Sequence, residues 1–209
     1  MRPRGLLLDA MGTLIGLREP LGVTYADHAA RHGLAVAAAS ISAAFPAVLA
    51  AAPPLAFPGL AGAELERAER RWWGERIDAV LAACGSGPAP RALHHDLYNA
   101  FAAPALWQVY PDVPGPLARW QAQGLRLAVV SNFDQRLPAL LEGLGLAERF
   151  EAVVISSSAG AAKPSPLPFQ RALEALDLAA AEVWHLGDSD DDVRGARAAG
   201  LRAVCWLRR

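Results

Sequence analysis

The chain has 209 residues, enough for one large domain or for a core with a smaller insertion. Its 20 basic and 21 acidic residues give a formal net charge of −1, so no nucleic-acid or anionic-membrane partner is expected. A small molecule is the expected ligand, bound by a monomer or a homodimer. Cys84 and Cys205 are too few for a disulfide framework and are expected to be buried thiols, which favours a cytoplasmic location.

The first predicted element is a strand over residues 5–10, with the sequence GLLLDA. Its leucines form an apolar run that is typical of a strand buried on both faces, and the run ends in the carboxylate of Asp9. Gly12 and Thr13 follow in a predicted turn. Since a carboxylate after a buried strand is usually only a turn or cap residue, Asp9 suggests chemistry only together with other groups.

Residues 16–104 differ from the rest of the chain because they show helical patterns and no convincing strand. The clearest helix is predicted within residues 69–84. Trp72 and Trp73 are expected to pack in this segment, with the alternative that one of them lines the entrance to a ligand site. One face of that helix carries apolar residues, namely Trp73, Ile77, Val80, Leu81 and Cys84. Residues 34–63 carry no charge, but prolines interrupt this alanine-rich stretch. We therefore expect short helices packed on protein, and no membrane span.

Strands and helices alternate in the remainder of the chain. Further strands are predicted over residues 125–132, 150–157, 183–189 and 201–207. Helices are predicted to begin at Arg136, Pro166 and Asp191. This alternation predicts right-handed βαβ crossovers and a parallel sheet with helices on both faces. The expected architecture is thus one strand, a helical insertion and then the rest of an α/β sheet.

Polar residues end three of the predicted strands: Asp9, Ser131 with Asn132, and Asp188. In an open parallel sheet, ligands bind beyond the carboxyl ends of the strands. We therefore expect these side chains to meet at one edge of the sheet. The only lysine of the chain, Lys163, is the natural candidate where the chemistry requires a compact cation.

These residues lie in four segments that resemble, in chain order, the four motifs of haloacid dehalogenase-like hydrolases: DAMGTL, VVSNFD, AAKPSP and GDSDDD. The resemblance covers nearly the whole chain and is most similar to the rhythmically expressed gene 2-like subgroup. It implies a Rossmann-like parallel-sheet core of residues 1–15 and 105–209. Residues 16–104 resemble the helical type 1 cap of that superfamily, inserted after the first strand.

The resemblance implies a Mg²⁺-dependent phosphatase that acts on a small phosphorylated metabolite. Asp9 is then the nucleophile that forms a covalent aspartyl-phosphate. Ser131, Asn132 and Thr13 are expected to hold the phosphoryl group. Lys163 is expected to neutralise its charge and that of the carboxylates.

The same resemblance implies a set of oxygen ligands for Mg²⁺, a hard cation that prefers a few carboxylates together with water and substrate oxygens. Asp9, Asp188 and the backbone carbonyl of Met11 are the expected ligands. Asp192 is expected as a further ligand, directly or from the outer shell, and Asp191 is its possible substitute. Asp190 is expected to be solvated or to cap a helix.

Met11 departs from the pattern of typical phosphatases in this superfamily, which have a second aspartate there. That aspartate protonates the leaving alcohol and later activates water, and methionine does neither. General acid–base assistance contributes typically ~10²–10⁴-fold, so ordinary alkyl phosphates should react poorly. Three interpretations remain open: a phosphatase for leaving groups that need no proton, a metal-independent 2-haloacid dehalogenase, and a catalytically impaired ligand-binding protein. His185, between apolar neighbours, is expected to be structural.

Overall fold

The computed structural model describes residues 2–205. Its main sheet has five parallel strands in the order β5-β4-β1-β6-β7. These strands are β1 (Gly5–Leu8), β4 (Arg126–Ser131), β5 (Ala152–Ile155), β6 (Val183–Gly187) and β7 (Arg202–Cys205). The predicted α/β class is therefore confirmed. The strand predicted over residues 201–207 is found as β7, whereas residues 206 and 207 lie outside the described part of the chain.

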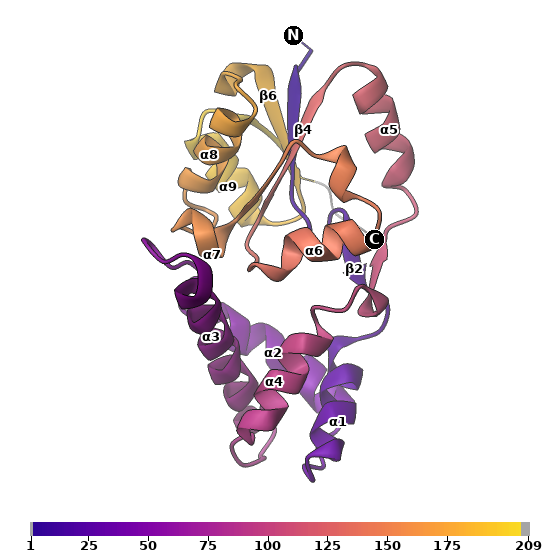
Figure 1. Ribbon diagram of the computed structural model, residues 1–209, viewed down its shortest axis with the longest axis vertical. Coiled ribbons are helices and arrows are strands. Elements are labelled where there is room, and N and C mark those ends of the chain that lie inside the picture. The colour runs from indigo at the N-terminus through magenta and orange to yellow at the C-terminus, as the bar shows by residue number, and fades with distance from the viewer. Residues whose placement is uncertain (1, 206–209) are drawn as a thin grey trace.

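Helices cover both faces of the sheet because successive strand residues point to opposite sides (Figure 1). Leu6 and Leu8 of β1 pack with one apolar cluster, and Leu7 packs with the other. On the first face lie α5 (Pro114–Ala122) and α6 (Arg136–Gly143). On the second lie α8 (Leu167–Ala175) and α9 (Asp190–Ala198), and the short α7 (Ser156–Ala159) follows β5. Each fully buried leucine contributes roughly 1.5–3 kcal/mol, so β1 is held firmly from both sides.

Four helices form a bundle beyond the carboxyl edge of the sheet (Figure 1). They are α1 (Leu21–Arg31), α2 (Ala38–Ala50), α3 (Gly62–Ala83) and α4 (Arg91–Ala100). The bundle has an apolar core of its own, in which Ile77, Val80 and Leu81 of α3 meet Leu93 and Leu97 of α4. The predicted apolar face of α3 is thus buried, except that Trp73 lies outside this core and the free thiol of Cys84 is half-buried.

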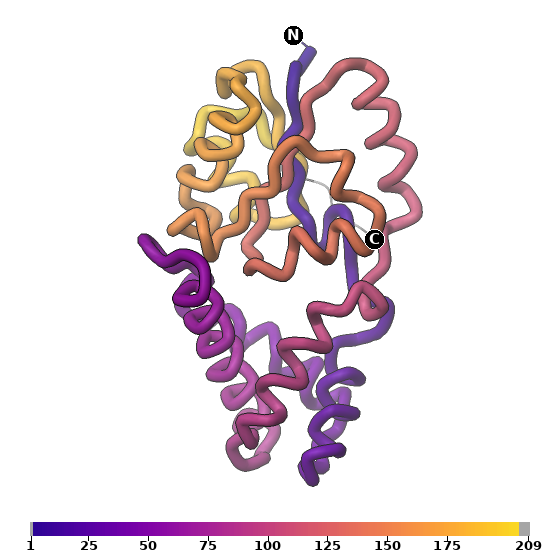
Figure 2. The backbone as a smooth tube through the Cα atoms, viewed as in Figure 1, coloured from indigo at the N-terminus to yellow at the C-terminus, as the bar shows by residue number. Residues whose placement is uncertain are grey.

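Two strands of three residues each link the bundle to the sheet. These are β2 (Ile15–Leu17) and β3 (Trp107–Val109), which pair antiparallel. Figure 2 shows the chain leaving toward the bundle and returning beside that outgoing segment. The expectation of no strand in residues 16–104 is wrong at its first two residues, because three residues are too few to show a periodicity. The division of the chain into residues 1–15 with 105–209, and 16–104, stays a prediction.

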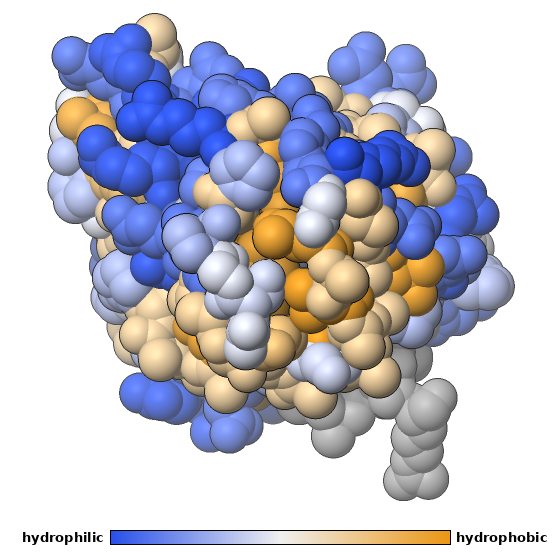
Figure 3. Space-filling model, turned by 90° about the horizontal axis from the view of Figure 1, so that it is seen from below, coloured by the Kyte–Doolittle hydropathy of each residue, from blue (hydrophilic) through white to orange (hydrophobic). Residues whose placement is uncertain are grey.

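The remaining regular elements are three single turns of 3₁₀-helix: Pro104–Leu106, Ala147–Arg149 and Ala180–Glu182. Within residues 2–205 no helix has the length and apolar character needed to cross a membrane. In the alanine-rich α2, which contains Pro46, only Ile41 is fully buried. Figure 3, which views the molecule from below, shows apolar surface near the middle of that face and hydrophilic side chains toward its margins.

Candidate functional site

Asp9 lies directly after β1, at the carboxyl edge of the sheet. Its backbone N–H donates to the carbonyl of Leu186 in β6 at 2.9 Å, which extends the ladder by one residue. Asp9 itself is only 5% exposed. Ser131, the last residue of β4, donates its hydroxyl to Oδ1 of Asp9 at 3.1 Å, and Nζ of Lys163 donates to the same oxygen at 2.6 Å. The three residues predicted to be catalytic therefore meet.

Lys163 is buried, and its ammonium group has three acceptors. Nζ donates to Oδ1 of Asp9 and to Oδ1 of Asp192, both at 2.6 Å, and to the carbonyl of Val130 at 3.2 Å. Since an ammonium has three N–H groups, these contacts satisfy it completely. Asn132 fixes the backbone of the lysine, because its side chain donates to the carbonyl of Lys163 at 3.1 Å and accepts from its N–H at 2.8 Å.

Asp192, in the first turn of α9, is held through both carboxylate oxygens. Oδ1 accepts from Lys163 and lies 2.8 Å from Nε2 of His185, whereas Oδ2 accepts from the hydroxyl and the N–H of Ser189 at 2.5 and 3.2 Å. Ser189 is the N-cap of α9 and accepts from the N–H of Asp192 in return, as in a capping box. Gly187 makes room for this carboxylate, because a Cβ there would lie 2.2 Å from Cγ of Asp192.

Burial and charge act in opposite directions at these groups. Burial alone would lower the pKa of Lys163, but the carboxylates of Asp9 and Asp192 raise it above its usual value. Burial would raise the pKa of Asp192, but the hydrogen bond from His185 and the charge of Lys163 lower it well below the usual range. At neutral pH the ammonium and this carboxylate are therefore a stable ion pair.

Asp188 adds a third carboxylate at the same edge. One oxygen of each of Asp9, Asp188 and Asp192 lies within 4.8 Å of the other two. Partial burial, and next the charge of Asp9, raise the pKa of Asp188. Gly12, at φ +87°, lets the loop after β1 approach closely, since a Cβ there would lie 2.1 Å from Oδ2 of Asp188. Such a cluster of oxygens fits a hard divalent cation.

Three other residues named in the sequence analysis, Asp190, Asp191 and Met11, have exposed side chains. The carboxylate of Asp191 is 46% exposed and faces Arg194, at 3.7 Å, on the same helix. Asp190 is exposed, as expected. Met11 is 46% exposed, and its backbone forms an isolated bridge with Ile15.

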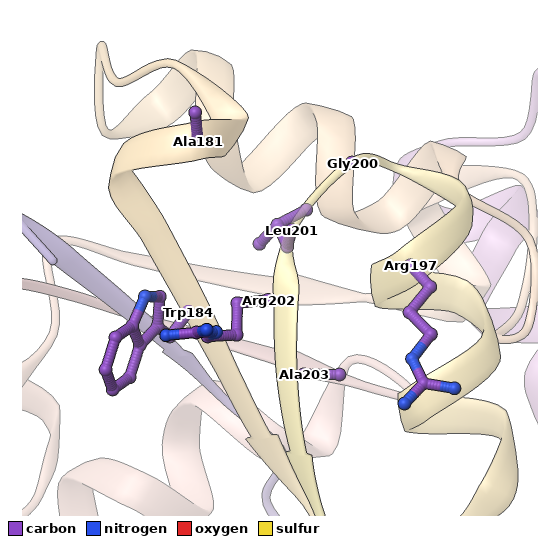
Figure 4. Close-up of a pocket in the computed structure, with 7 residues that line it drawn as sticks. All are labelled: Ala181, Trp184, Arg197, Gly200, Leu201, Arg202 and Ala203. Carbon is purple, nitrogen blue, oxygen red and sulfur yellow. The ribbon is translucent and has the colours of Figure 1, made fainter. Parts of the chain in front are cut away.

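Neither of two cavities in the structure is lined by Asp9, Asp188 or Asp192. One of about 590 Å³ opens at the amino-terminal ends of β6 and β7, where the guanidinium of Arg202 lies 5.1 Å from the ring centroid of Trp184 (Figure 4). This is the sheet edge opposite Asp9. The other, of about 320 Å³ and mainly apolar, lies beside α5 and is lined by Thr13 among others. Since ligands of parallel sheets bind at the carboxyl edge, the carboxylates mark the better candidate site.

Comparison with known proteins identifies the family. The family model for haloacid dehalogenase-like hydrolases matches residues 3–200. The chain belongs to this family. The haloacid dehalogenase-like hydrolase domain-containing protein 3 of Bos taurus is 37% identical over 203 residues, which cover 96% of this chain and 80% of the relative. The assignment to the rhythmically expressed gene 2-like subgroup stays a prediction.

Other proteins similar to this chain are named for different reactions. A phosphoserine phosphatase of Thermus thermophilus is 38% identical over 126 residues, covering 59% of this chain and 50% of the relative. The L-2-haloacid dehalogenase of Xanthobacter autotrophicus has a TM-score of 0.69 at 24% identity, covering 98% of this chain and 77% of the other. This haloacid dehalogenase-like hydrolase therefore has the architecture of the family, and its reaction must be argued from its own site.

Two contacts of the site were not predicted from the sequence of this family member. His185 is buried in β6, as expected of a structural residue, but its Nε2 is bound to Asp192. The alternation of His185 with apolar neighbours predicted that the side chain is buried, but it did not indicate which residue binds the ring nitrogen. Ser189 was not singled out, although the spacing of Ser189 and Asp192 is that of a capping box, a signal readable in sequence.

Proposed function

We propose that this haloacid dehalogenase-like hydrolase is a Mg²⁺-dependent phosphatase that acts on a small phosphorylated metabolite through an aspartyl-phosphate at Asp9. One observation carries the proposal: the buried ammonium of Lys163 is shared between Asp9 and Asp192, at 2.6 Å from each. An ammonium beside a nucleophilic carboxylate compensates the negative charge of an arriving phosphoryl group. The phosphatase relative within the family supports the same reaction class.

Asp9 is oriented for attack. Within the described part of the chain, the hydrogen bonds from Ser131 and Lys163 both go to Oδ1. Oδ2 is then the oxygen that attacks phosphorus, while the bond to the leaving oxygen breaks and the bonding pair departs with it. Ser131 and Lys163 turn their donors to the phosphoryl oxygens. Water then cleaves the aspartyl-phosphate, releasing phosphate and restoring the carboxylate.

The oxygen-rich donor set fits Mg²⁺. Asp9, Asp188 and the backbone carbonyl of Met11 would hold it. Because both oxygens of Asp192 are already occupied by donors, Asp192 would act from the outer shell, as the anchor of Lys163. When bound, the cation offsets the charge that the nucleophile and the phosphoryl group bring together.

We further propose that residues 16–104 are a cap over a core of residues 1–15 and 105–209. The bundle lies beyond the carboxyl edge of the sheet (Figure 1). Asp9 follows β1 directly at that edge. In that position the bundle limits the access of water and the size of the substrate. Asn132 would act indirectly, by holding the backbone of Lys163. Thr13 would contribute to holding the phosphoryl group from the loop after β1.

Met11 restricts the substrates that this site hydrolyses well. With no carboxylate at that position, an alkoxide leaving group receives no proton from it. The carboxylate of an acyl phosphate and the phenolate of an aryl phosphate leave without such help, so acyl and aryl phosphates are the favoured substrates. Since Met11 is 46% exposed, there is room for an added carboxylate, and Met11→Asp should raise alkyl-phosphate hydrolysis by about 10-fold or more. Met11→Asn is the matched control, because asparagine has the size of aspartate but no acidic group. This variant should give no gain.

The deciding experiment is a panel of acyl, aryl and alkyl phosphates, assayed with Mg²⁺ and with a chelator. We expect turnover of acetyl phosphate or p-nitrophenyl phosphate that requires Mg²⁺ and disappears in Asp9→Asn. Activity that survives Asp9→Asn would remove Asp9 as the nucleophile. If Mg²⁺ binds and no phosphate is turned over, the protein is a ligand-binding member of the family.

Dehalogenation is the second candidate, and the specific observation that favours it is Met11, because halide needs no proton to leave. Asp188 opposes it, since a metal-independent reaction has no use for a third carboxylate so close to Asp9. Halide release from a 2-haloacid in the presence of a chelator would establish this rival.

A further inference from the structure

The loop that carries Ser131 is bound directly to the helical bundle. Asp134, three residues after Ser131, is completely buried and accepts a hydrogen bond from the indole N–H of Trp73, in α3, at 2.6 Å. Arg136 forms a bidentate pair with the same carboxylate, with Nε at 2.8 Å from Oδ1 and Nη2 at 2.6 Å from Oδ2. We call Trp73, Asp134 and Arg136 the clamp.

The bundle also surrounds the cation of the clamp. The guanidinium of Arg136 lies 4.1 Å from the ring centroid of Tyr98, in α4, and 5.1 Å from that of Trp73. Its Nη1 donates to the carbonyl of Tyr98 at 3.0 Å. The side chain of Arg136 is only 8% exposed, so these contacts form in a largely dry interface where hydrogen bonds to charged groups are strong.

A second attachment lies on the same loop. The backbone N–H of Gln135 donates to Oε1 of Glu69, in α3, at 3.1 Å, and Glu69 is completely buried. Three consecutive residues, 134–136, are therefore fixed to α3 or α4. The other end of the loop is Ser131, which donates to Asp9, and three residues of extended chain span at most about 10 Å. Asp134 is therefore close enough along the chain for a shift of its position to act on Ser131.

We propose that Trp73 is a positioning residue: through Asp134 it ties the phosphoryl-binding loop at Ser131 to the docked position of the bundle. Docking of the bundle and alignment of Ser131 against Asp9 are then one event. The role in phosphoryl binding rests on the proposed function, whereas the mechanical coupling between bundle and loop does not.

The chain offers a matched pair of variants. Trp72 and Trp73 are neighbours on α3, and each donates its indole N–H to an oxygen. Trp73 donates to Asp134, which lies outside the bundle. Trp72 donates at 3.0 Å to the carbonyl of Pro53, which belongs, like α3, to the part of the chain between β2 and β3. Trp73→Phe and Trp72→Phe therefore remove the same indole N–H, and only the N–H of Trp73 donates to the Ser131 loop. Because the two rings also meet edge to face, with centroids 4.8 Å apart, the Trp72→Phe control includes any effect of disturbing that ring contact.

Amide hydrogen exchange tests the coupling without any substrate. The reporter is the N–H of Phe133, which donates to the carbonyl of Ser131 at 2.9 Å, so the hydrogen bond that protects it lies within the Ser131 loop. We expect Trp73→Phe to raise its exchange rate about tenfold, as for loss of one hydrogen bond to a charged acceptor. Trp72→Phe should leave it within about twofold. Equal rates in the two variants would overturn the proposal.

A second variant of Trp73 distinguishes loss of the hydrogen bond to Asp134 from loss of the packing of the indole ring. Trp73→His restores a ring N–H beside Asp134 and should return the exchange rate of Phe133 toward that of the wild type, although the ring is smaller. If Trp73→His exchanges as fast as Trp73→Phe, or if either variant unfolds while Trp72→Phe does not, ring packing and not the hydrogen bond is responsible, and the proposal fails.

Phosphate binding adds the functional measurement. Inorganic phosphate, titrated with Mg²⁺ present, should bind about fivefold or more weakly to Trp73→Phe than to Trp72→Phe, and KM for p-nitrophenyl phosphate should rise by a similar factor with a smaller change in kcat. A wild-type protein without phosphatase activity would refute the proposed function, and the exchange experiment would still decide the coupling. Equal phosphate affinities in the two variants would remove the role in phosphoryl binding.

Discussion

Two buried cations sit in contrasting surroundings in this molecule. Lys163, at the edge of the sheet, meets only oxygens, because Asp9, Asp192 and the carbonyl of Val130 take its three N–H groups. Arg136, where the sheet meets the bundle, is paired with one carboxylate and lies against aromatic rings. Both are nearly inaccessible, with side chains 4% and 8% exposed.

The difference follows from the shapes of the two cations. An ammonium is a compact charge that can turn its donors from a carboxylate to a phosphoryl oxygen without a change in its own position. A guanidinium is a planar fork that matches a carboxylate in two places and stacks on rings, which makes it suited to holding two surfaces in one geometry. The lysine centre is thus suited to chemistry and the arginine centre to docking.

Among the variants that compare these two cations, Lys163→Met should have the largest effect. We expect kcat/KM for an aryl phosphate to fall about 10²–10³-fold, because the group that compensates the phosphoryl charge is lost. Lys163→Arg keeps the charge but should remain poor, since a fork does not fit between Asp9 and Asp192. Steady-state kinetics with p-nitrophenyl phosphate measure both. A Lys163→Met variant that retains activity within about threefold would contradict the assignment of the lysine to chemistry.

Asp134→Asn should destabilise the fold by roughly 3 kcal/mol, because it leaves the buried guanidinium of Arg136 without its charged partner. Glu151→Gln is the matched control, since Glu151 is also bidentate to an arginine, with Nε of Arg126 at 3.1 Å from Oε1 and Nη2 at 2.6 Å from Oε2. The side chains of Glu151 and Arg126 are 43% and 38% exposed. The control should lose less than about 1 kcal/mol. Urea unfolding measures both. Similar losses would mean that geometry, and not burial, sets the strength of these pairs.

The meeting of polar side chains at one edge of the sheet was predictable from sequence because its signals are local. Each strand is a short apolar run, and Asp9, Ser131 and Asp188 follow such runs directly, so a parallel sheet must bring them to one edge. Lys163 was found by being the only lysine. Asp192 was found by its spacing from Asp188 in a known motif.

The clamp was not predictable in this way. Trp73 was expected to pack within the bundle, because its spacing from Ile77 and Val80 matches a helix face. In the structure its indole instead reaches Asp134, 61 residues later in the chain. No periodicity reports a contact between two elements with separate cores. The strands β2 and β3 were not predicted for a related reason. A strand of three residues is too short to show a pattern of its own, and its pairing is set by the tertiary structure.

Asp188→Asn gives the smallest expected effect and bears on the charge balance at the lysine centre. Because the pKa of Asp188 is raised in the folded state, its ionisation opposes folding. The variant should therefore gain about 1 kcal/mol at neutral pH without divalent cations, the repulsion expected between partly solvated charges at this separation, or about 2–4 °C in Tm. The gain should vanish as the pH falls below about 4, where an ordinary carboxyl group is protonated in both states.

Mg²⁺ should make the wild type more stable than Asp188→Asn, which reverses the order of their Tm values. The reason is that a bound cation would attract both Asp9 and Asp188 and so offset the repulsion between them. Thermal unfolding with and without Mg²⁺ measures this, with Asp191→Asn as the control. Asp191 belongs to the same run of aspartates, but it is 46% exposed and faces Arg194, so its replacement should change Tm little in either condition. If Asp188→Asn lowers Tm without Mg²⁺, or if Mg²⁺ stabilises Asp188→Asn as much as the wild type, Asp188 is not the carboxylate at which charge accumulates.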